Sequence, residues 1–256
     1  MSDRPVRITE ICYHHIKDDP PNLAILPWGA TEAHGQHLPY GTDVLQAEAF
    51  AVHSAELAQK EGAKVVVYPP IPFGNNAQQL DQISTIHLST TTAFAILKDV
   101  VHSLTAQGID RLIILNAHGG NEFKPLIRDL QEEFGILIVL VNFYQIEPGL
   151  LTEIFDEPGD HAGEMETSLL LHLFPDRVYP ELAGDGARNP FQIRALNQPG
   201  AWSPRPWQQS HPDFGAGNPR KATAEKGKKY FEKICRRIKD VIVDLSKAQK
   251  GELPYI

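Results

Sequence analysis

Acidic and imidazole side chains gather just after the first strongly apolar segment of the chain. Glu32 and His34 lie two residues apart, and Asp43 follows in the same glycine-rich stretch. In extended backbone, side chains two apart point the same way, so Glu32 and His34 can converge on one point. Asp43 stands near the start of the next expected helix, where the helix dipole favours a carboxylate. Each residue alone also fits a plainer role, as a surface charge (Glu32), a loop donor (His34) or a helix cap (Asp43).

A second histidine follows another apolar run, in the sequence Asn-Ala-His-Gly-Gly-Asn at residues 116–121. The two glycines allow a sharp turn or a close approach of the backbone to a ligand, and Asn121 can cap the following helix. His118 is therefore expected at the end of a strand. Taken alone, it also fits a loop histidine that is hydrogen-bonded to a nearby carbonyl.

A third cluster contains Glu164 and Glu166 at the start of an expected helix. Leucines stand three, four and seven residues after Glu166, which places this carboxylate on the buried face. A buried carboxylate needs a cation, a hydrogen-bond network or a raised pKa. Glu164 lies off the apolar stripe and fits a charge in the first turn that complements the helix dipole.

Together these clusters supply oxygen and nitrogen ligands without a thiolate: Glu32, His34, Asp43, His118 and Glu166. Such a set suits Zn²⁺, Mn²⁺ or Fe²⁺ in an open catalytic site. Five ligands suggest two metal ions, because one aspartate can bridge ions roughly 3.5–4 Å apart, and such a pair can hold hydroxide and polarise a carbonyl. His161 lies outside this set and fits a proton shuttle, since the neighbouring Asp160 can fix its tautomer.

Short apolar runs alternate with longer amphipathic stretches, which predicts one α/β domain over residues 1–256 with a mostly parallel sheet. Strands are expected at 23–27, 63–68, 111–115 and 136–142, and helices at 43–61, 89–107, 121–134, 162–173 and 222–249. The polar clusters sit where strands end, which is the edge of a parallel sheet where ligands bind. Cys235 falls on the apolar stripe of the last helix and fits a core residue.

Residues 179–219 form a long stretch without periodicity that is rich in Pro, Gly, Asn and Gln and contains Trp202, Trp207 and Phe214. Loops of this length in compact domains are usually functional or disordered. The aromatic residues favour an ordered loop that covers a site or a subunit interface.

Composition excludes several classes of protein. The formal charge is −8, with 24 basic and 32 acidic residues and no basic stripe, so a nucleic acid partner is not expected. No apolar run approaches the ~20 residues needed to cross a bilayer, so no membrane association is expected. With two cysteines and no visible secretory signal, a cytoplasmic location is expected.

The motifs resemble those of the creatininase family, also called creatinine amidohydrolases. The likeness is carried by residues 29–43, 116–121, 161–168 and 217–227. The resemblance implies a three-layer α/β/α sandwich, a two-metal centre, hydrolysis of a non-peptide or cyclic amide bond, and a homohexamer. It places the family's metal-binding positions on Glu32, His34, Asp43 and His118, with Asp43 as the bridge, and the family's catalytic histidine and the acidic residue before it on His161 and Asp160.

The chain departs from the family pattern at one ligand and in the pocket. Creatininase has a glutamate where this chain has Gly120, and we expect Glu166 to replace it, with Glu122 as the second candidate. Asn76 and Gln79 stand where many members have Ser and His, and a mismatched polar group in a pocket strongly alters specificity. Creatinine is therefore not the expected substrate. A formamide-cleaving deformylase and a peptidase that trims a redox-cofactor precursor are similar branches. His37, in the first motif, fits a residue that orients a ligand.

The leading interpretation is a metal-dependent amidohydrolase that cleaves an amide, cyclic amide or formamide bond of a small polar substrate. The alternative is a non-catalytic ligand-binding or assembly protein that keeps the fold, which the missing ligand at Gly120 favours. A metallophosphoesterase is a weaker option, because the motifs contain no Lys or Arg clamp.

Overall fold

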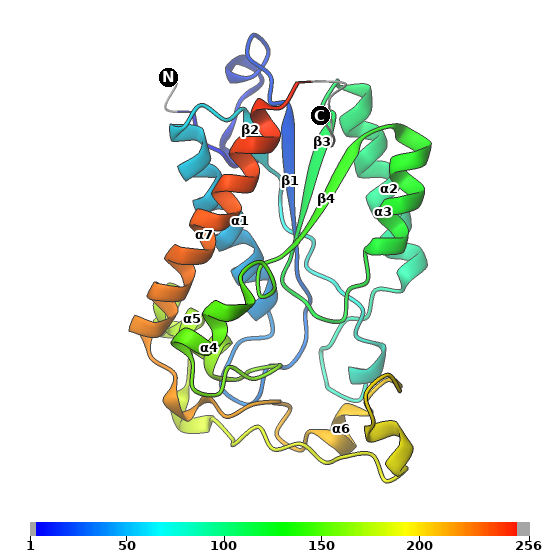
Figure 1. Cartoon of the computed structure of the whole chain (residues 1–256), viewed down its shortest axis with the longest axis vertical. Coiled ribbons are helices and arrows are strands. Elements are labelled where there is room, and N and C mark those ends of the chain that lie inside the picture. Colours follow the sequence, from blue (N-terminus) through cyan, green and yellow to red (C-terminus); the bar gives the residue numbers. More distant parts are fainter. Residues whose placement is uncertain (1–3, 250–256) are drawn as a thin grey trace.

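The chain folds around one parallel β-sheet. The structure is a computed structural model and describes residues 4–249. Its strands are β1 (Leu23–Trp28), β2 (Val65–Val67), β3 (Arg111–Asn116) and β4 (Leu137–Asn142), in the order β2-β1-β3-β4 (Figure 1). Every neighbouring pair is parallel. The expected α/β fold with a mostly parallel sheet is confirmed, although β2 is shorter than expected.

The described residues form seven α-helices: α1 (Thr42–Lys60), α2 (Thr90–Ala106), α3 (Lys124–Phe134), α4 (Pro148–Ile154), α5 (Glu164–Leu173), α6 (Trp207–Ser210) and α7 (Ala224–Lys247). Short 3-10 helices occupy Ile8–Glu10, Tyr13–His15, Ala77–Gln79, Pro175–Arg177, Pro180–Leu182, Arg194–Asn197 and Pro219–Lys221. The five expected helices correspond to α1, α2, α3, α5 and α7, whereas α4 and α6 were not expected. Ser89 and Thr223 cap α2 and α7 through their hydroxyls.

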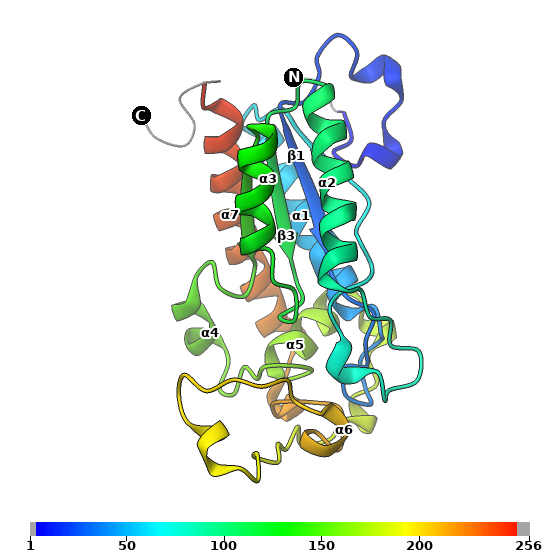
Figure 2. The same ribbon diagram turned by 90° about the vertical axis from the view of Figure 1, so that its right-hand side faces the viewer.

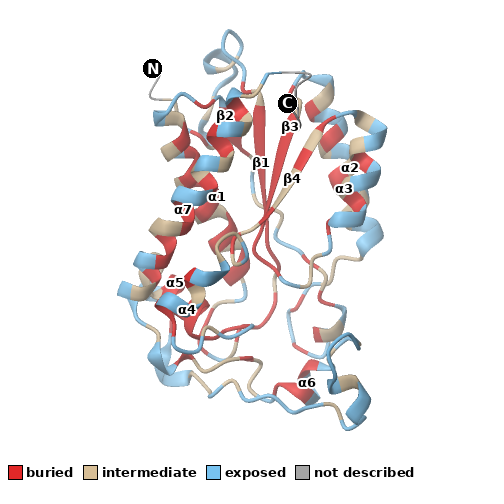
Figure 3. Cartoon of the chain, in the orientation of Figure 1, coloured by how far each residue is buried: buried red, intermediate tan, exposed pale blue. Residues whose placement is uncertain are grey.

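Alternation along the strands produces two apolar layers. Ile113 and Leu115 face the core shared with α1, α5 and α7, whereas Leu112 and Ile114 face the core shared with α2 and α3. In Figure 1, α1 and α7 lie to the left of the strands and α2 and α3 to their right, and Figure 2, viewed from that right-hand side, has α2 and α3 in front of the sheet. All residues of β1 and β3 are buried, as Figure 3 shows. The expected three layers are therefore present.

The apolar stripe of α7 packs against α1, α5 and β1. Cys235 is buried in this core, which confirms its expected place. The structure corrects in part the interpretation of Glu164 as a first-turn charge that lies off the apolar stripe. It lies in the first turn of α5, but it is fully buried and accepts hydrogen bonds from Lys226 Nζ and from the backbone of Glu157. The Glu164–Lys226 pair thus joins α5 to α7, and Glu164 also lies in the first turn of α5, where the helix dipole favours a carboxylate.

The order of the strands defines the edge where a ligand fits. The chain leaves β1 toward β2 on one side and then crosses back to place β3 on the other side of β1. In open parallel sheets, ligands bind beyond the carboxyl ends of the strands at the place where this order reverses. The loops that follow β1 and β3 meet at this place, below the sheet in Figure 1.

The segment 179–219 crosses the same end of the molecule, at the bottom of Figure 1. Its helix α6 contacts the 3-10 helix Ala77–Gln79, and the backbone N–H of Gln208 donates to Asp81 at 3.2 Å. The part of the segment around α6 thus packs beside the carboxyl end of the sheet. None of the helices formed by residues 4–249 combines the length and the apolar character that a membrane span requires.

Candidate metal centre

The loop after β1 places Glu32 and His34 in the interior. The loop passes close to α1 at Gly29, where a larger residue would not fit, because a Cβ at this position would lie 2.6 Å from the backbone nitrogen of Val44. Both side chains are fully buried. The Nδ1 atom of His34 lies 3.1 Å from the carbonyl oxygen of Glu32. This contact fixes the ring, so its Nε2 atom faces Asp43.

Asp43 lies in the first turn of α1 and contacts two histidines. Its Oδ1 atom is 3.0 Å from His34 Nε2, and its Oδ2 atom is 3.2 Å from His118 Nδ1. The residue before the helix is Gly41 rather than Asp43, so the plainer role as a helix cap is wrong. The two oxygens of Asp43 therefore reach two different histidines.

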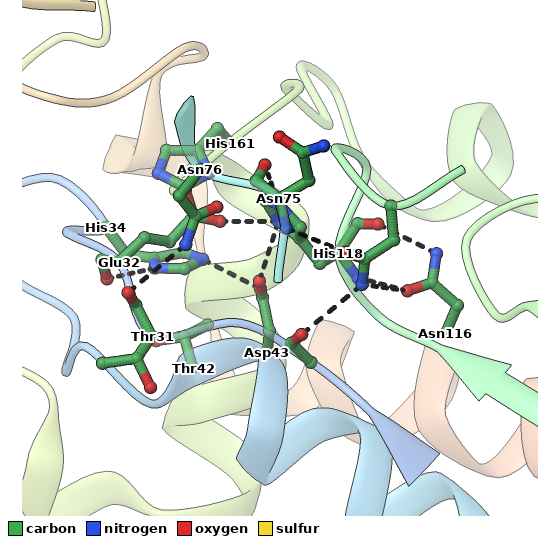
Figure 4. A network of polar contacts seen from close by, with 12 residues as sticks. Thr31, Glu32, His34, Thr42, Asp43, Asn75, Asn76, Asn116, His118 and His161 are labelled. Atoms are coloured by element: carbon green, nitrogen blue, oxygen red, sulfur yellow. Dashed lines mark hydrogen bonds and ion pairs between the residues drawn. The ribbon is translucent and has the colours of Figure 1, made fainter. Parts of the chain in front are cut away.

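His118 follows β3 and completes the group on the other side. Its Nε2 atom lies 3.1 Å from the carbonyl oxygen of Asn75, while its Nδ1 atom is 2.7 Å from Glu32 Oε1. Figure 4 shows Glu32, Asp43 and His118 turned toward one another. A ring that donates one N–H to a backbone carbonyl presents its other nitrogen as a metal ligand.

Asparagine side chains hold the loop that carries His118. Asn116 accepts from the backbone N–H of His118 at 3.2 Å and donates to its carbonyl at 2.9 Å. Asn121 donates to Asn116 and accepts from the backbone of Asn75. Asn121 was expected to cap α3, and this is wrong, because α3 is preceded by Phe123 and has no side-chain cap. The amide instead ties two loops together.

Glu166 reaches the same place from α5. Its Oε2 atom accepts a hydrogen bond of 2.5 Å from the backbone N–H of Ala162. Ligand atoms of His34, Asp43 and Glu166 lie within 4.8 Å of one another, as do those of Glu32, Asp43 and His118. Asp43 belongs to both groups. Glu122 is exposed and belongs to neither of these groups of described residues.

The donor set fits divalent cations. Both carboxylate oxygens of Glu32 and the Oδ2 atom of Asp43 are buried and have no hydrogen-bond partner among the described residues. The 2.7 Å contact of Glu32 with His118 is a close ion-pair contact without hydrogen-bond geometry. Burying a carboxylate without compensation is costly. Cations held between these oxygens and the imidazole nitrogens would supply that compensation.

The pKa values of the cluster show the same excess of negative charge. Burial opposes the charged form of His34, but Asp43 outweighs it and the pKa of His34 is raised to about 10. Burial raises the pKa of Glu166 to about 7, and the nearby Asp43 adds to the shift. Burial, together with the charge of His34, lowers the pKa of His161 to about 4. The carboxylates thus favour the protonated forms of His34 and Glu166, whereas His161 is neutral near pH 7.

His161 lies against the cluster, and its orientation differs from expectation. Its Nε2 atom lies 2.7 Å from the carbonyl oxygen of Ala33, which fixes the tautomer in place of Asp160. Asp160 pairs with Arg205 Nη1 at 2.7 Å. The His161 ring lies 4.1 Å from His34 and 4.7 Å from Trp207, measured between ring centroids. Ligand atoms of Glu32, His34 and His161 form a third close group.

A cavity of about 480 Å³ opens beside the cluster. Glu32, His118 and His161 line it on the side of the candidate metal centre. Gln79, Asp160, Trp202, Arg205 and Trp207 line it as well. The sequence indicated the tryptophans through the aromatic content of segment 179–219, but nothing in the sequence pattern marked Arg205. His37 is buried and lies 2.9 Å from the Thr167 hydroxyl, next to Glu166, which fits a supporting role.

A family model described as Creatininase: Creatinine amidohydrolase matches residues 11–242. The match covers most of the chain, together with the loops and helices that carry the buried cluster. The chain belongs to the creatininase family.

Curated relatives carry different activities. The mycofactocin precursor peptide peptidase of Mycolicibacterium smegmatis is 29% identical over 61% of this chain and 60% of that protein. The creatinine amidohydrolase of Pseudomonas putida is 27% identical over 61% of this chain and 66% of that protein. The 2-amino-5-formylamino-6-ribosylaminopyrimidin-4(3H)-one 5'-monophosphate deformylase of Methanothermus fervidus is 32% identical over 58% of this chain and 54% of that protein. The chain spans less than two thirds of the length of each of these relatives.

Solved structures match over nearly the whole chain. A Bacteroides fragilis protein, provisionally described as a creatinine amidohydrolase, is 41% identical with a TM-score of 0.89 and covers 98% of this chain and 100% of that chain. A creatininase described as the Mn form is 23% identical with a TM-score of 0.79 and covers 96% of this chain and 100% of its own. The second match shows a shared fold.

Proposed function

We propose that the chain is a metal-dependent amidohydrolase that cleaves a C–N bond of a small polar amide, cyclic amide or formamide. The observation that carries this proposal is the pair of buried ligand groups that share Asp43. Two divalent ions, Zn²⁺, Mn²⁺ or Fe²⁺, would polarise the scissile carbonyl and lower the pKa of water there. Creatinine amidohydrolase and the deformylase, by their names, act on bonds of this kind.

The residues divide between the two ions. Glu32, Asp43 and His118 would hold one, and His34, Asp43 and Glu166 the other. Glu166 is favoured over Glu122 as the replacement for the ligand missing at Gly120, because it is buried within reach of His34 and Asp43. The carbonyls of Glu32 and Asn75 keep the ligating nitrogens of the histidines pointed at the carboxylates.

His161 is the proposed proton carrier. Its Nε2 atom is occupied by the Ala33 carbonyl, so Nδ1 is the nitrogen that exchanges protons while the ring lines the cavity. It would take a proton from the attacking water and return it to the leaving nitrogen. Asp160, which also lines the cavity, would act with it indirectly: it pairs with Arg205, Arg205 lies over the Trp207 ring, and Trp207 packs against the histidine.

Metal counting combined with hydrolysis tests this function. Purified protein loaded with Mn²⁺, Zn²⁺ or Fe²⁺ is assayed on cyclic amides, formamides and short peptides. We expect about two ions per chain and hydrolysis of at least one class. Protein that binds no metal and hydrolyses none of these compounds would instead be the non-catalytic binding protein that the missing ligand favours.

The molar mass of the protein in solution tests the proposed homo-oligomer, with a hexamer expected from the family resemblance.

Four variants separate the roles. Asp43→Ala should lose both metal and hydrolysis, whereas His161→Ala should keep metal and lose turnover. Glu166→Gln should lose metal, and Glu122→Gln is its matched control with metal unchanged. Unchanged metal content in Asp43→Ala would remove the bridge, and metal loss in Glu122→Gln alone would transfer the ligand role to that residue.

A further inference from the structure

We propose that the cavity selects substrates that carry an anionic group, a carboxylate or a phosphate, and that Arg205 binds this group. The inference rests on the proposed hydrolase function and specifies the substrate by its charge. It starts from the part of segment 179–219 that lines the cavity, where Arg205 stands between Trp202 and Trp207 in the sequence.

Two neighbours hold the Arg205 side chain before any ligand arrives. Its Nη1 atom donates to Asp160 Oδ2 at 2.7 Å, and its guanidinium carbon lies 5.1 Å from the ring centroid of Trp207. The side chain is 23% exposed. A planar guanidinium that is already stacked and paired loses little further freedom when it binds a ligand.

Most N–H groups of Arg205 remain available. A guanidinium has five N–H donors, and Asp160 is the acceptor that the described residues provide for it. Arg205 also lines a second cavity of about 440 Å³, to which Arg188 contributes. Arg205 therefore borders open space on two sides. A fork of parallel N–H groups matches the oxygens of a carboxylate or a phosphate.

Charge at this part of the cavity favours an anion over a cation. Among the described residues that line the cavity, Arg205 is the only Lys or Arg. The carboxylate of Asp160 is already paired with it, and Glu32 belongs to the candidate metal centre. Glu122 lines the cavity as well, but among the described residues Arg205 forms its ion pair with Asp160 and not with Glu122, so a cationic group placed at Arg205 would meet the guanidinium beside a carboxylate that is already paired. Trp202, 82% exposed, adds an apolar surface for the body of the substrate.

The placement also indicates where the anion lies on the substrate. Trp207 contacts Arg205 on one side and His161 on another, with its ring 4.7 Å from the His161 ring. One aromatic side chain thus separates the guanidinium from the proposed proton carrier. The substrate would carry its anionic group a few bonds from the scissile amide.

Four matched formamides test the proposal. N-formylglycine carries a carboxylate, N-formyl-O-phosphoethanolamine a phosphate, N-formylglycinamide no charge, and N-formylethylenediamine a cation. Metal-loaded protein is assayed for hydrolysis and, separately, for binding by calorimetry. We compare the wild type with Arg205→Gln, Arg205→Lys and Arg194→Gln. Arg194 is an exposed arginine of the same segment and lines neither of the two cavities, so it controls for the loss of one charge.

We expect the wild type to favour at least one anionic probe over the neutral one by about 10- to 100-fold, mainly through KM. The better of the two anions identifies carboxylate or phosphate. Arg205→Gln should abolish the preference, Arg205→Lys should retain part of it because the charge stays while the fork is lost, and Arg194→Gln should match the wild type.

Equal losses on all four probes in Arg205→Gln would overturn the proposal, because Arg205 would then only hold Asp160 and His161 in place. A wild-type preference for the cationic or neutral probe would overturn it as well. Selective binding of anions without hydrolysis would reject the hydrolase and keep the anion site. Hydrolysis without any preference for charge would keep the hydrolase function and reject the anion site.

Discussion

The carbonyl oxygen of Asn75 occupies the space that a side chain at Gly120 would need. A Cβ at Gly120 would lie 2.6 Å from this oxygen and 2.5 Å from Nε2 of His118. The same carbonyl lies 3.1 Å from that ring nitrogen. The Asn75 carbonyl therefore fills the space beside Gly120 and also orients the His118 ring, so the lack of a side chain at position 120 and the orientation of His118 depend on the same packing.

Gly120→Ala should disturb metal binding, because the added methyl group displaces the His118 ring or the Asn75 carbonyl. Loss of such a supporting contact typically costs about 10- to 100-fold in metal affinity, and we expect that range in a competition titration. Gly119→Ala is the matched control, since its Cβ would meet nothing within 4 Å and its φ is not positive. Equal affinity in the two variants would contradict this account.

Asn116→Ala should release the loop that carries His118, because it removes both side-chain bonds to the His118 backbone. Metal affinity and kcat/KM should fall by about 10- to 100-fold. Asn22→Ala serves as the control: Asn22 directly precedes β1, at the amino end of the strands and away from the candidate metal centre, and forms hydrogen bonds with Ser246. It should lower Tm without changing metal affinity. If Asn116→Ala merely shifts Tm in the same way, the positioning role is wrong.

Lys226→Met should destabilise the fold, because it leaves the fully buried Glu164 without its cation. We expect a loss of about 1–3 kcal/mol in the free energy of unfolding, measured by urea titration. Lys228→Met on the same helix removes only an exposed pair with Glu232, and its effect should stay within about 0.5 kcal/mol. Similar stabilities for the two variants would show that the buried pair contributes nothing.

The two cysteines should differ in their reaction with a thiol reagent. Cys12 is exposed and Cys235 is buried, and burial raises the pKa of Cys235 to about 12. The thiolate is the reactive form, so native protein at pH 8 should titrate one thiol per chain and denatured protein both. Native Cys12→Ser should react slowly. Rapid reaction of that variant would place Cys235 at the surface.

The sequence predicted the sheet because its strands are apolar runs that are buried on one or both faces, as with β1 and β3. It missed α4, which begins with Pro148 and Gly149, and α6, which has only four residues, because neither is long enough to show a helical period. Glu32 and His34 could be singled out since their spacing carries meaning in extended backbone.

Other parts of the site leave no mark in the sequence. Asn75 contributes a backbone carbonyl, which every residue type possesses. Arg205 reaches Asp160 across 45 positions of the chain from a segment without periodicity. Asp160 was expected to orient His161, yet the Ala33 carbonyl does so. Such contacts depend on how loops pack, and residue spacing does not specify that.

The ligand atoms near Asp43 come from the loop after β1, the first turn of α1, the loop after β3 and the helix α5. No fragment that ends before Glu166 contains both groups. Ion capture would thus require the native topology, and an ion that binds only the native state shifts the folding equilibrium by mass action. If the proposed ions bind in this way, protein kept without them would hold a larger unfolded fraction, and that fraction is open to proteolysis.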